Sequence, residues 1–154
     1  MTLFYFAGLI VLVIVGYMLG RSRAAVAGQA AQLHSRPVYH GAFVVVSILI
    51  PMLILFVLAV PIADRIVNSQ AIQALDPALL DDDLKRGAAL RDIVAVATGR
   101  YSGQATDALR NAADVYASLR SWANTLIVGA GWIFGLFGIA WALPPVRTTT
   151  TGLP

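Results

Sequence analysis

The chain of 154 residues contains no cysteine and no glutamate, and only 12% of its residues are charged. The absence of cysteine excludes a disulfide framework, a zinc ribbon and any thiol nucleophile. A soluble domain carries about 25% charged residues, so this chain has about half the charge that a water-facing surface needs. Because 58% of the residues are hydrophobic, a membrane is the first environment to consider.

The net charge of +3 does not indicate nucleic-acid binding. A basic nucleic-acid-binding surface needs Lys and Arg clustered on one face. Here the basic residues are scattered along the chain, and Lys85 is the single lysine. We therefore expect no nucleic-acid partner, and we interpret the positive charge as a signal of membrane topology.

Three long runs contain no charged side chain, at residues 2–20, 42–63 and 123–143. A hydrocarbon core of about 30 Å needs about 20 helical residues to cross it, and each run is long enough. In lipid, a helix satisfies its backbone hydrogen bonds within itself. The runs therefore predict an all-α integral membrane protein with three transmembrane helices, which has the lipid bilayer as its first partner.

The charges beside these runs predict the orientation. A secretory signal peptide would need positive charge before its apolar core, but Arg21 and Arg23 follow the first run, so we predict an anchor. Residues 21–41 hold three Arg and no acid, whereas residues 64–122 hold eight Asp against seven basic residues. Because positive residues stay cytoplasmic, we expect a cytoplasmic loop at 21–41, a periplasmic segment at 64–122 and a periplasmic N-terminus in a bacterial inner (cytoplasmic) membrane.

The segment 64–122 has helical patterning. Asp76-Pro77 is typical of an N-cap followed by proline at the first helical position, and an apolar pattern continues from there to Gly99, a helix-ending glycine. A second amphipathic pattern begins near Gln104 and enters the third apolar run without a breaker. We expect an external amphipathic helical hairpin between the second and third transmembrane helices.

Two features within the apolar runs concern helix shape and packing. Pro51 cannot donate a hydrogen bond to the carbonyl of Ser47, so we expect a kink there, either a static bend or a hinge. Gly131 and Gly135 form a GxxxG pattern, which lets helix backbones approach closely. We interpret this pair as a helix-packing position.

The sequence shows no motif for catalysis. The P-loop, HExxH and GxSxG patterns are absent. Asp81, Asp82 and Asp83 would point about 100° apart on a helix, so they cannot converge on one cation. No acid or Lys lies inside an apolar run, where an ion or proton pathway would need one. We expect no enzymatic activity, no cofactor, no metal site and no substrate-binding residue in this chain.

The run GRSRAAVAGQAAQLHSRPVYHGAF at residues 20–43 has a recognisable pattern. It resembles the N-terminal extension of some bacterial phosphate ABC-importer permeases, the C subunit of the Pst system, and DALRNAADVYASLRSW at residues 107–122 is similar to the end of that extension. The resemblance covers most of residues 1–143. It implies a non-catalytic module in inorganic phosphate import, beside the permease core subunits and their ATPase. The cytoplasmic interaction loop would then contain Arg21, Arg23, His34, Arg36 and Tyr39.

The chain departs from that family in one respect. An ABC permease docks on its ATPase through a coupling helix typically built around Glu-Ala-Ala, and this chain has no Glu. We therefore expect either the extension alone, as a fragment or split gene product, or an independent relative, with residues 144–154 as a polar tail or linker. The alternative from a different class is a stand-alone membrane sensor or adaptor whose periplasmic hairpin binds a partner.

Overall fold

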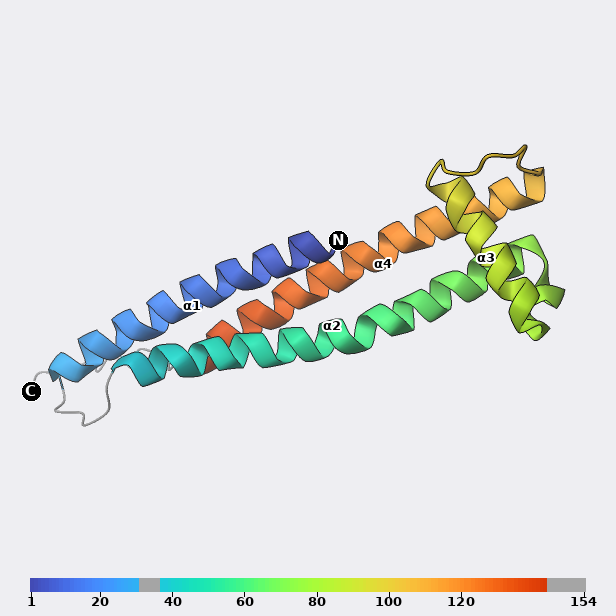
Figure 1. Ribbon diagram of the computed structural model, residues 1–154. Coiled ribbons are helices and arrows are strands. Elements are labelled where there is room, and N and C mark those ends of the chain that lie inside the picture. Colours follow the sequence, from blue (N-terminus) through green and yellow to red (C-terminus); the bar gives the residue numbers. More distant parts are fainter. Residues whose placement is uncertain (31–36, 144–154) are drawn as a thin grey trace, which may run out of the picture. The chain divides into compact units, whose positions relative to one another are not determined.

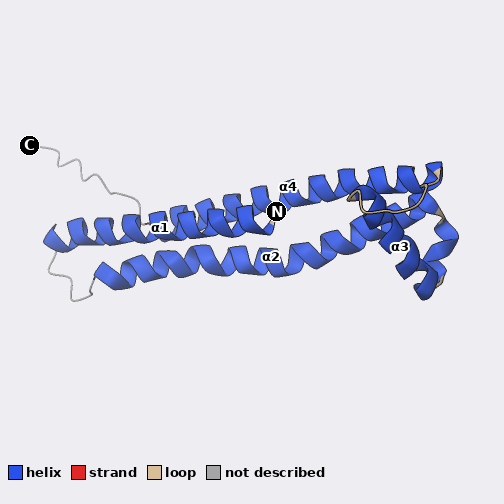
Figure 2. Ribbon diagram, turned by 45° about the horizontal axis from the view of Figure 1, so that its top comes forward, coloured by secondary structure: helices blue, strands red, loops and turns tan. Residues whose placement is uncertain are grey.

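The computed structural model describes residues 1–30 and 37–143, and every regular element within these ranges is a helix. The elements in chain order are α1 (Thr2–Ala30), α2 (Pro37–Leu75), the 3₁₀ helix η1 (Pro77–Asp81), α3 (Asp83–Ala97) and α4 (Asp107–Ala142) (Figures 1 and 2). The all-helical prediction is confirmed. Helices α1, α2 and α4 are each long and apolar enough to cross a membrane, as the three uncharged runs predicted.

The long helices extend beyond the apolar runs. Helix α1 continues to Ala30 and α2 begins at Pro37, so much of the segment 21–41, which we expected to be a loop, is helical. The reason is local: Arg, Ala and Gln, which dominate residues 21–30, are good helix formers, and the stretch contains a single glycine and no proline. Residues 31–36 lie outside the described residues.

Helix α2 continues through both of its internal prolines, Pro51 and Pro61, and ends at Leu75. Each proline removes one backbone donor, but the rest of a 39-residue helix supplies the bonds on either side. The sequence pattern placed the end of this span near residue 63. The helix instead continues by about three turns into the charged segment.

The helix expected from Asp76 to Gly99 is divided in two, which corrects the sequence interpretation. Asp76 caps only the short η1, where the Ala78 N–H donates to its Oδ1 at 2.9 Å. Asp82 then has extended backbone and caps α3. An aspartate side chain competes with the helical backbone for nearby N–H groups, so a second cap starts a new helix. Gly99 closes α3 with a φ of 69°, as expected.

The chain divides into two compact units, which are described separately. The first unit comprises the described residues of 1–55 together with residues 129–143. In it, α1 lies alongside the first part of α2 and the last part of α4 (Figures 1 and 2). The side chains buried in this unit are Tyr5, Leu9, Val44, Ile48 and Met52.

The second unit comprises residues 56–128. Its hydrophobic core takes residues from the end of α2, from α3 and from the beginning of α4, namely Ala71, Ile72, Ile93, Leu109, Ala112 and Ala113. The core therefore rests on three helices, where the expected hairpin had two. The difference follows from the length of α2, because its last turns supply an apolar face that the sequence interpretation did not include in either helix of the hairpin.

Candidate functional site

The residues expected in the interaction loop are placed in part. Arg21 and Arg23 are exposed on α1, and Tyr39 is 70% exposed in the first turn of α2. His34 and Arg36 lie outside the described residues. The structure therefore shows three of the five side chains exposed on helices.

Helices α1 and α4 of the first unit contact each other through two reciprocal pairs of an aromatic ring and a glycine. A Cβ added at Gly131 of α4 would overlap the ring of Tyr5 on α1, and a Cβ added at Gly8 of α1 would overlap the indole of Trp132 on α4. Each glycine therefore leaves room for the ring of the other helix. Close approach at small residues is the usual packing device of membrane helices.

Gly135 and Gly138 continue this glycine face of α4. A Cβ at Gly135 would lie 2.6 Å from Leu12 Cδ1 and 2.8 Å from Met52 Sδ, so it would meet α1 and α2 together. At Gly138 the neighbours are backbone: a Cβ would overlap the Ser47 carbonyl oxygen and lie 3.0 Å from its carbon. A side chain can rotate away, but helical backbone cannot, so Gly138 is the more restrictive position.

The contact at Gly138 involves the proline of α2. Pro51 follows Ser47 by four residues and has no N–H, so the Ser47 carbonyl lacks its usual partner within the helix. The position that a Cβ of residue 138 would take overlaps this oxygen, so the carbonyl lies in space that only a glycine at this position leaves open. The sequence interpretation named Pro51 and the glycine pattern separately. It did not relate them, because nothing in the spacing shows which helix faces which.

Tyr5 is a packing residue that the sequence interpretation missed. Its side chain is fully buried, and its hydroxyl donates to the backbone carbonyl of Met52 at 2.6 Å. A hydroxyl without a partner in an apolar environment carries a large desolvation cost, so this bond determines where the ring can lie. The sequence feature that could have identified Tyr5 as a packing residue is its polar hydroxyl within the first apolar run.

The second unit contains an ion pair that joins two long helices. Arg120 of α4 donates through Nη1 to Oδ1 of Asp64 on α2. The two side chains are partly exposed, at 37% and 40% of their surface, so the pair contributes little to stability, typically about 0.2–1 kcal/mol. Both residues flank apolar runs in the sequence. That position was the signal that could have found them.

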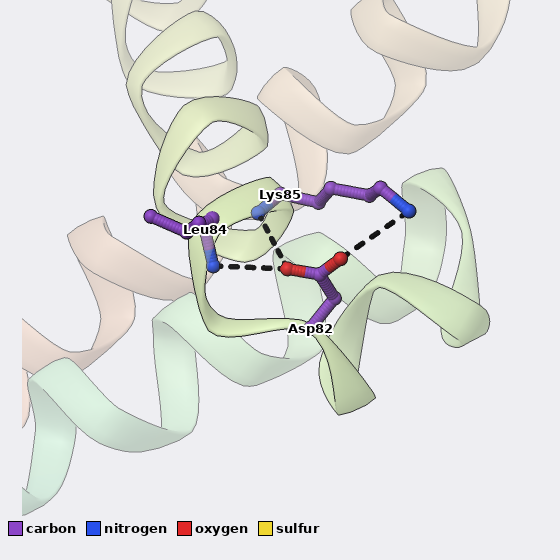
Figure 3. A network of polar contacts seen from close by, with 3 residues as sticks. All are labelled: Asp82, Leu84 and Lys85. Carbon is purple, nitrogen blue, oxygen red and sulfur yellow. Dashed lines mark hydrogen bonds and ion pairs between the residues drawn. The ribbon is translucent and has the colours of Figure 1, made fainter.

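Asp82, the middle residue of the acidic run Asp81–Asp83, is the N-cap of α3 (Figure 3). The backbone N–H groups of Leu84 and Lys85 both donate to Oδ1 of Asp82 at 3.1 Å, and the Lys85 ammonium lies 3.2 Å from its Oδ2. Hydrogen bonds from the Lys85 backbone and side chain, with Leu84 contributing less, lower the pKa of Asp82. Among the described residues, no group of His and acidic side chains is arranged to hold a metal ion.

Helix α3 is flanked by two hollows. One, of about 440 Å³, is lined mainly by apolar residues of α3 together with Arg91 and Arg100. The other, of about 620 Å³, lies between α2 and α3 and includes Arg65 and Arg86. No motif in the sequence marks Arg65 and Arg86 as a pair. The two residues lie about twenty positions apart on different helices, so they leave no local pattern.

One comparison with known proteins gives a match. A family model described as "Phosphate ATP-binding cassette transporter" matches residues 6–139, a range that takes in most of α1, all of α2 and α3 and most of α4. No curated protein and no solved structure matches the chain.

Proposed function

The chain belongs to the phosphate ATP-binding cassette transporter family, and on that premise we propose that it is a non-catalytic membrane module of a phosphate importer permease. The module contributes to inorganic phosphate transport across the bacterial inner membrane by packing beside the permease core. The observation that carries the proposal is the extent of the family match, which takes in most or all of each of the three helices that are long enough to span a membrane among the described residues.

The distribution of charge supports an accessory role over a pathway-forming one. The apolar runs contain no acid and no Lys, whereas an ion pathway through lipid needs ionisable groups that face it. The first unit, where the long helices pack on glycines and aromatic rings, buries no polar or charged residue among those described. Phosphate would therefore pass through partner subunits, with this chain beside them.

The proposed partners are the permease core and its ATPase, reached from the cytoplasmic side. The exposure of Arg21, Arg23 and Tyr39 supports a contact surface at that end, with His34 and Arg36 as further members. Arg side chains suit such a surface because their planar guanidinium groups bind carboxylates and phosphates in a bidentate way.

Co-purification tests this proposal. The chain expressed at native level and extracted in mild detergent should bring down a phosphate permease or its ATPase, and the triple change Arg21→Ala, Arg23→Ala and Arg36→Ala should weaken the recovery. Arg110→Ala is the matched control, because Arg110 is exposed but lies on the second unit. Recovery of the chain without either partner would refute the proposal and favour the stand-alone sensor or adaptor.

The proposed topology has its own test. The chain has no cysteine, so single cysteines can be introduced without a background. With a periplasmic N-terminus, Ser102→Cys should react with an impermeant thiol reagent in intact cells, and Gln29→Cys should react only after permeabilisation. The reverse labelling pattern would overturn the orientation.

A further inference from the structure

The hollow between α2 and α3 in the second unit has an uneven distribution of charge. Its volume is about 620 Å³, and its polar lining consists of Arg65, Asn68 and Ser69 from α2 and Asp83 and Arg86 from α3. Two cations therefore face one anion. This is the reverse of the segment as a whole, in which Asp outnumbers the basic residues.

Arg65 accounts for this excess of positive charge. The neighbouring acid, Asp64, is paired with Arg120, and within the described part of the chain no carboxylate lies within ion-pair distance of Arg65. No acidic side chain of the described residues therefore neutralises the Arg65 guanidinium group, and Arg65 belongs to the lining of the hollow. Arg65 lies two residues beyond the apolar run that ends at residue 63.

Arg86 uses only part of its guanidinium group in an ion pair. Its Nη2 lies 2.6 Å from Oδ1 of Asp83, a carboxylate that is 86% exposed. A guanidinium group has five N–H donors, so this single contact leaves others for a ligand. Ser69 supplies no donor, because its hydroxyl already donates to the Ile66 carbonyl at 3.0 Å. The donors available from the lining are Arg65, Arg86 and the amide of Asn68.

We propose that this hollow binds a phosphate group, with Arg65 and Arg86 holding its oxygens from two sides and Asn68 donating a further hydrogen bond. Guanidinium groups match the spacing of phosphate oxygens and bind them in a bidentate way. A tetrahedral oxyanion can accept from several directions at once, which suits donors on two separate helices. The group is either free inorganic phosphate or the phosphodiester of an anionic lipid. The position of Arg65 just beyond an apolar run is compatible with both.

Gly87 allows a test that leaves the charges unchanged. It lines this hollow and also the neighbouring hollow of about 440 Å³, and a Cβ there would meet nothing within 4 Å. Gly87→Leu therefore adds a bulky side chain at the lining without altering a charge, and it also improves the helix propensity of α3. This variant should fold at least as well as the wild type and still lose the ligand, which separates a binding defect from unfolding.

The experiment uses the purified full chain in two arms with the same variants. In the first arm, inorganic phosphate is titrated calorimetrically into the chain in neutral detergent at constant ionic strength. In the second, the chain is reconstituted in phosphatidylcholine nanodiscs with or without phosphatidylglycerol, and retained lipid is measured by native mass spectrometry. Arg65→Gln and Arg86→Gln should each weaken binding about tenfold or more, the usual effect of losing a charge-assisted hydrogen bond. Arg110→Gln is the matched control.

The two arms identify the source of the phosphate group. Loss of inorganic phosphate binding in Arg65→Gln, Arg86→Gln and Gly87→Leu supports a free-phosphate site, and loss of phosphatidylglycerol retention in the same variants supports a lipid site. The inference is overturned if neither ligand binds, or if Arg110→Gln weakens binding as much as Arg65→Gln does. It is independent of the co-purification result, because it requires no partner subunit.

Discussion

The two units of this chain are packed in different ways, although α2 and α4 contribute to both. The first unit also buries aliphatic side chains, but in addition its helices meet where glycines admit aromatic rings and backbone, as Gly131 admits Tyr5 and Gly138 admits the Ser47 carbonyl. The second unit holds its helices together with aliphatic side chains, centred on the fully buried Ile93. The first unit contains long uncharged runs, and the second contains 15 of the charged residues.

This difference shows that α2 and α4 are stabilised by different kinds of contact in the two units. In lipid, burying an apolar side chain between helices gains little, because the lipid is equally apolar, so close van der Waals contact at small residues holds membrane helices together. In water, apolar burial is worth about 25 cal/mol per Å². The proposed topology, with the apolar runs in lipid and most of the second unit outside it, accounts for the glycine contacts of one unit and the aliphatic core of the other. The substitutions below are chosen to test the contrast.

The largest effect is expected for Ile93→Ala in the second unit. Ile93 has no exposed surface, and removing its side chain leaves a cavity, so the unit should lose about 2–5 kcal/mol of stability. Thermal unfolding by circular dichroism, together with faster amide exchange in α3, would show it. A loss below that range would mean that the second unit does not depend on an aliphatic core.

Gly138→Ala should be the next largest effect, and it tests the first unit. The added Cβ meets the Ser47 backbone, which cannot rotate aside, so we expect a loss of about 1–3 kcal/mol, as for other overpacked sites. Gly129→Ala is the matched control on the same helix, because a Cβ there meets nothing within 4 Å. Unfolding in mild detergent measures both. Equal stability of the two variants would contradict glycine-mediated contact between α4 and α2.

Tyr5→Phe should have a smaller effect in the same unit. It keeps the ring against Gly131 but removes the hydroxyl that donates to the Met52 carbonyl. One hydrogen bond between membrane helices is worth about 0.6 kcal/mol on average. Unfolding in detergent measures this loss, and Tyr5→Ala, which also removes the ring, should cost several times more. If both changes cost the same, the hydroxyl rather than the ring would hold Tyr5 in place.

Gly87→Ala should change stability in the opposite direction from Gly138→Ala. Gly87 lies inside α3 with no atom near the position of a Cβ, so alanine should stabilise the second unit by about 0.5–1 kcal/mol through a lower helix entropy cost. A raised unfolding temperature would support this. Destabilisation would mean that glycine is needed for packing in both units, and the contrast between them would fail.

The smallest effect concerns the pH dependence of α3. The pKa of Asp82 is lowered by hydrogen bonds from Lys85 and Leu84, so its ionised form favours the folded cap. This stabilisation is present above the ordinary pKa of Asp and disappears as the pH falls through the lowered value. Protection of the Leu84 and Lys85 amides in hydrogen exchange should decline over that acid range in the wild type. It should decline less in Asp82→Asn, which keeps a cap without a charge.

The sequence predicted helices better than it predicted their ends. Uncharged runs located the three long helices, because a hydrocarbon core demands length and apolar composition and little else. The continuation of α2 to Leu75 and the division at Asp82 were missed. The continuation of α2 depends on helix propagation past a charged boundary. The division at Asp82 depends on an aspartate side chain that accepts hydrogen bonds from the next backbone N–H groups.

The candidate site residues were predictable to different degrees. The exposure of Arg21 and Arg23 follows from their place beside an apolar run. The hollow with Arg65 and Arg86 was not predictable, since it depends on α2 extending far enough to lie beside α3. The pairing of Asp64 with Arg120, which leaves Arg65 without an acid among the described residues, also depends on how two helices are rotated.

Length, charge and composition alone thus predicted the helices of the described residues and the three among them that are able to cross a membrane, because the solvent requirement acts on each helix separately. The packing of the helices decided everything that involves two of them at once: which ring lies on Gly131, which carbonyl Gly138 approaches, and which arginines share a hollow. The spacing of residues along the sequence shows which of them share one face of a helix. Which neighbouring helix packs against that face depends on how the helices are rotated and shifted relative to one another, and no local sequence pattern encodes this.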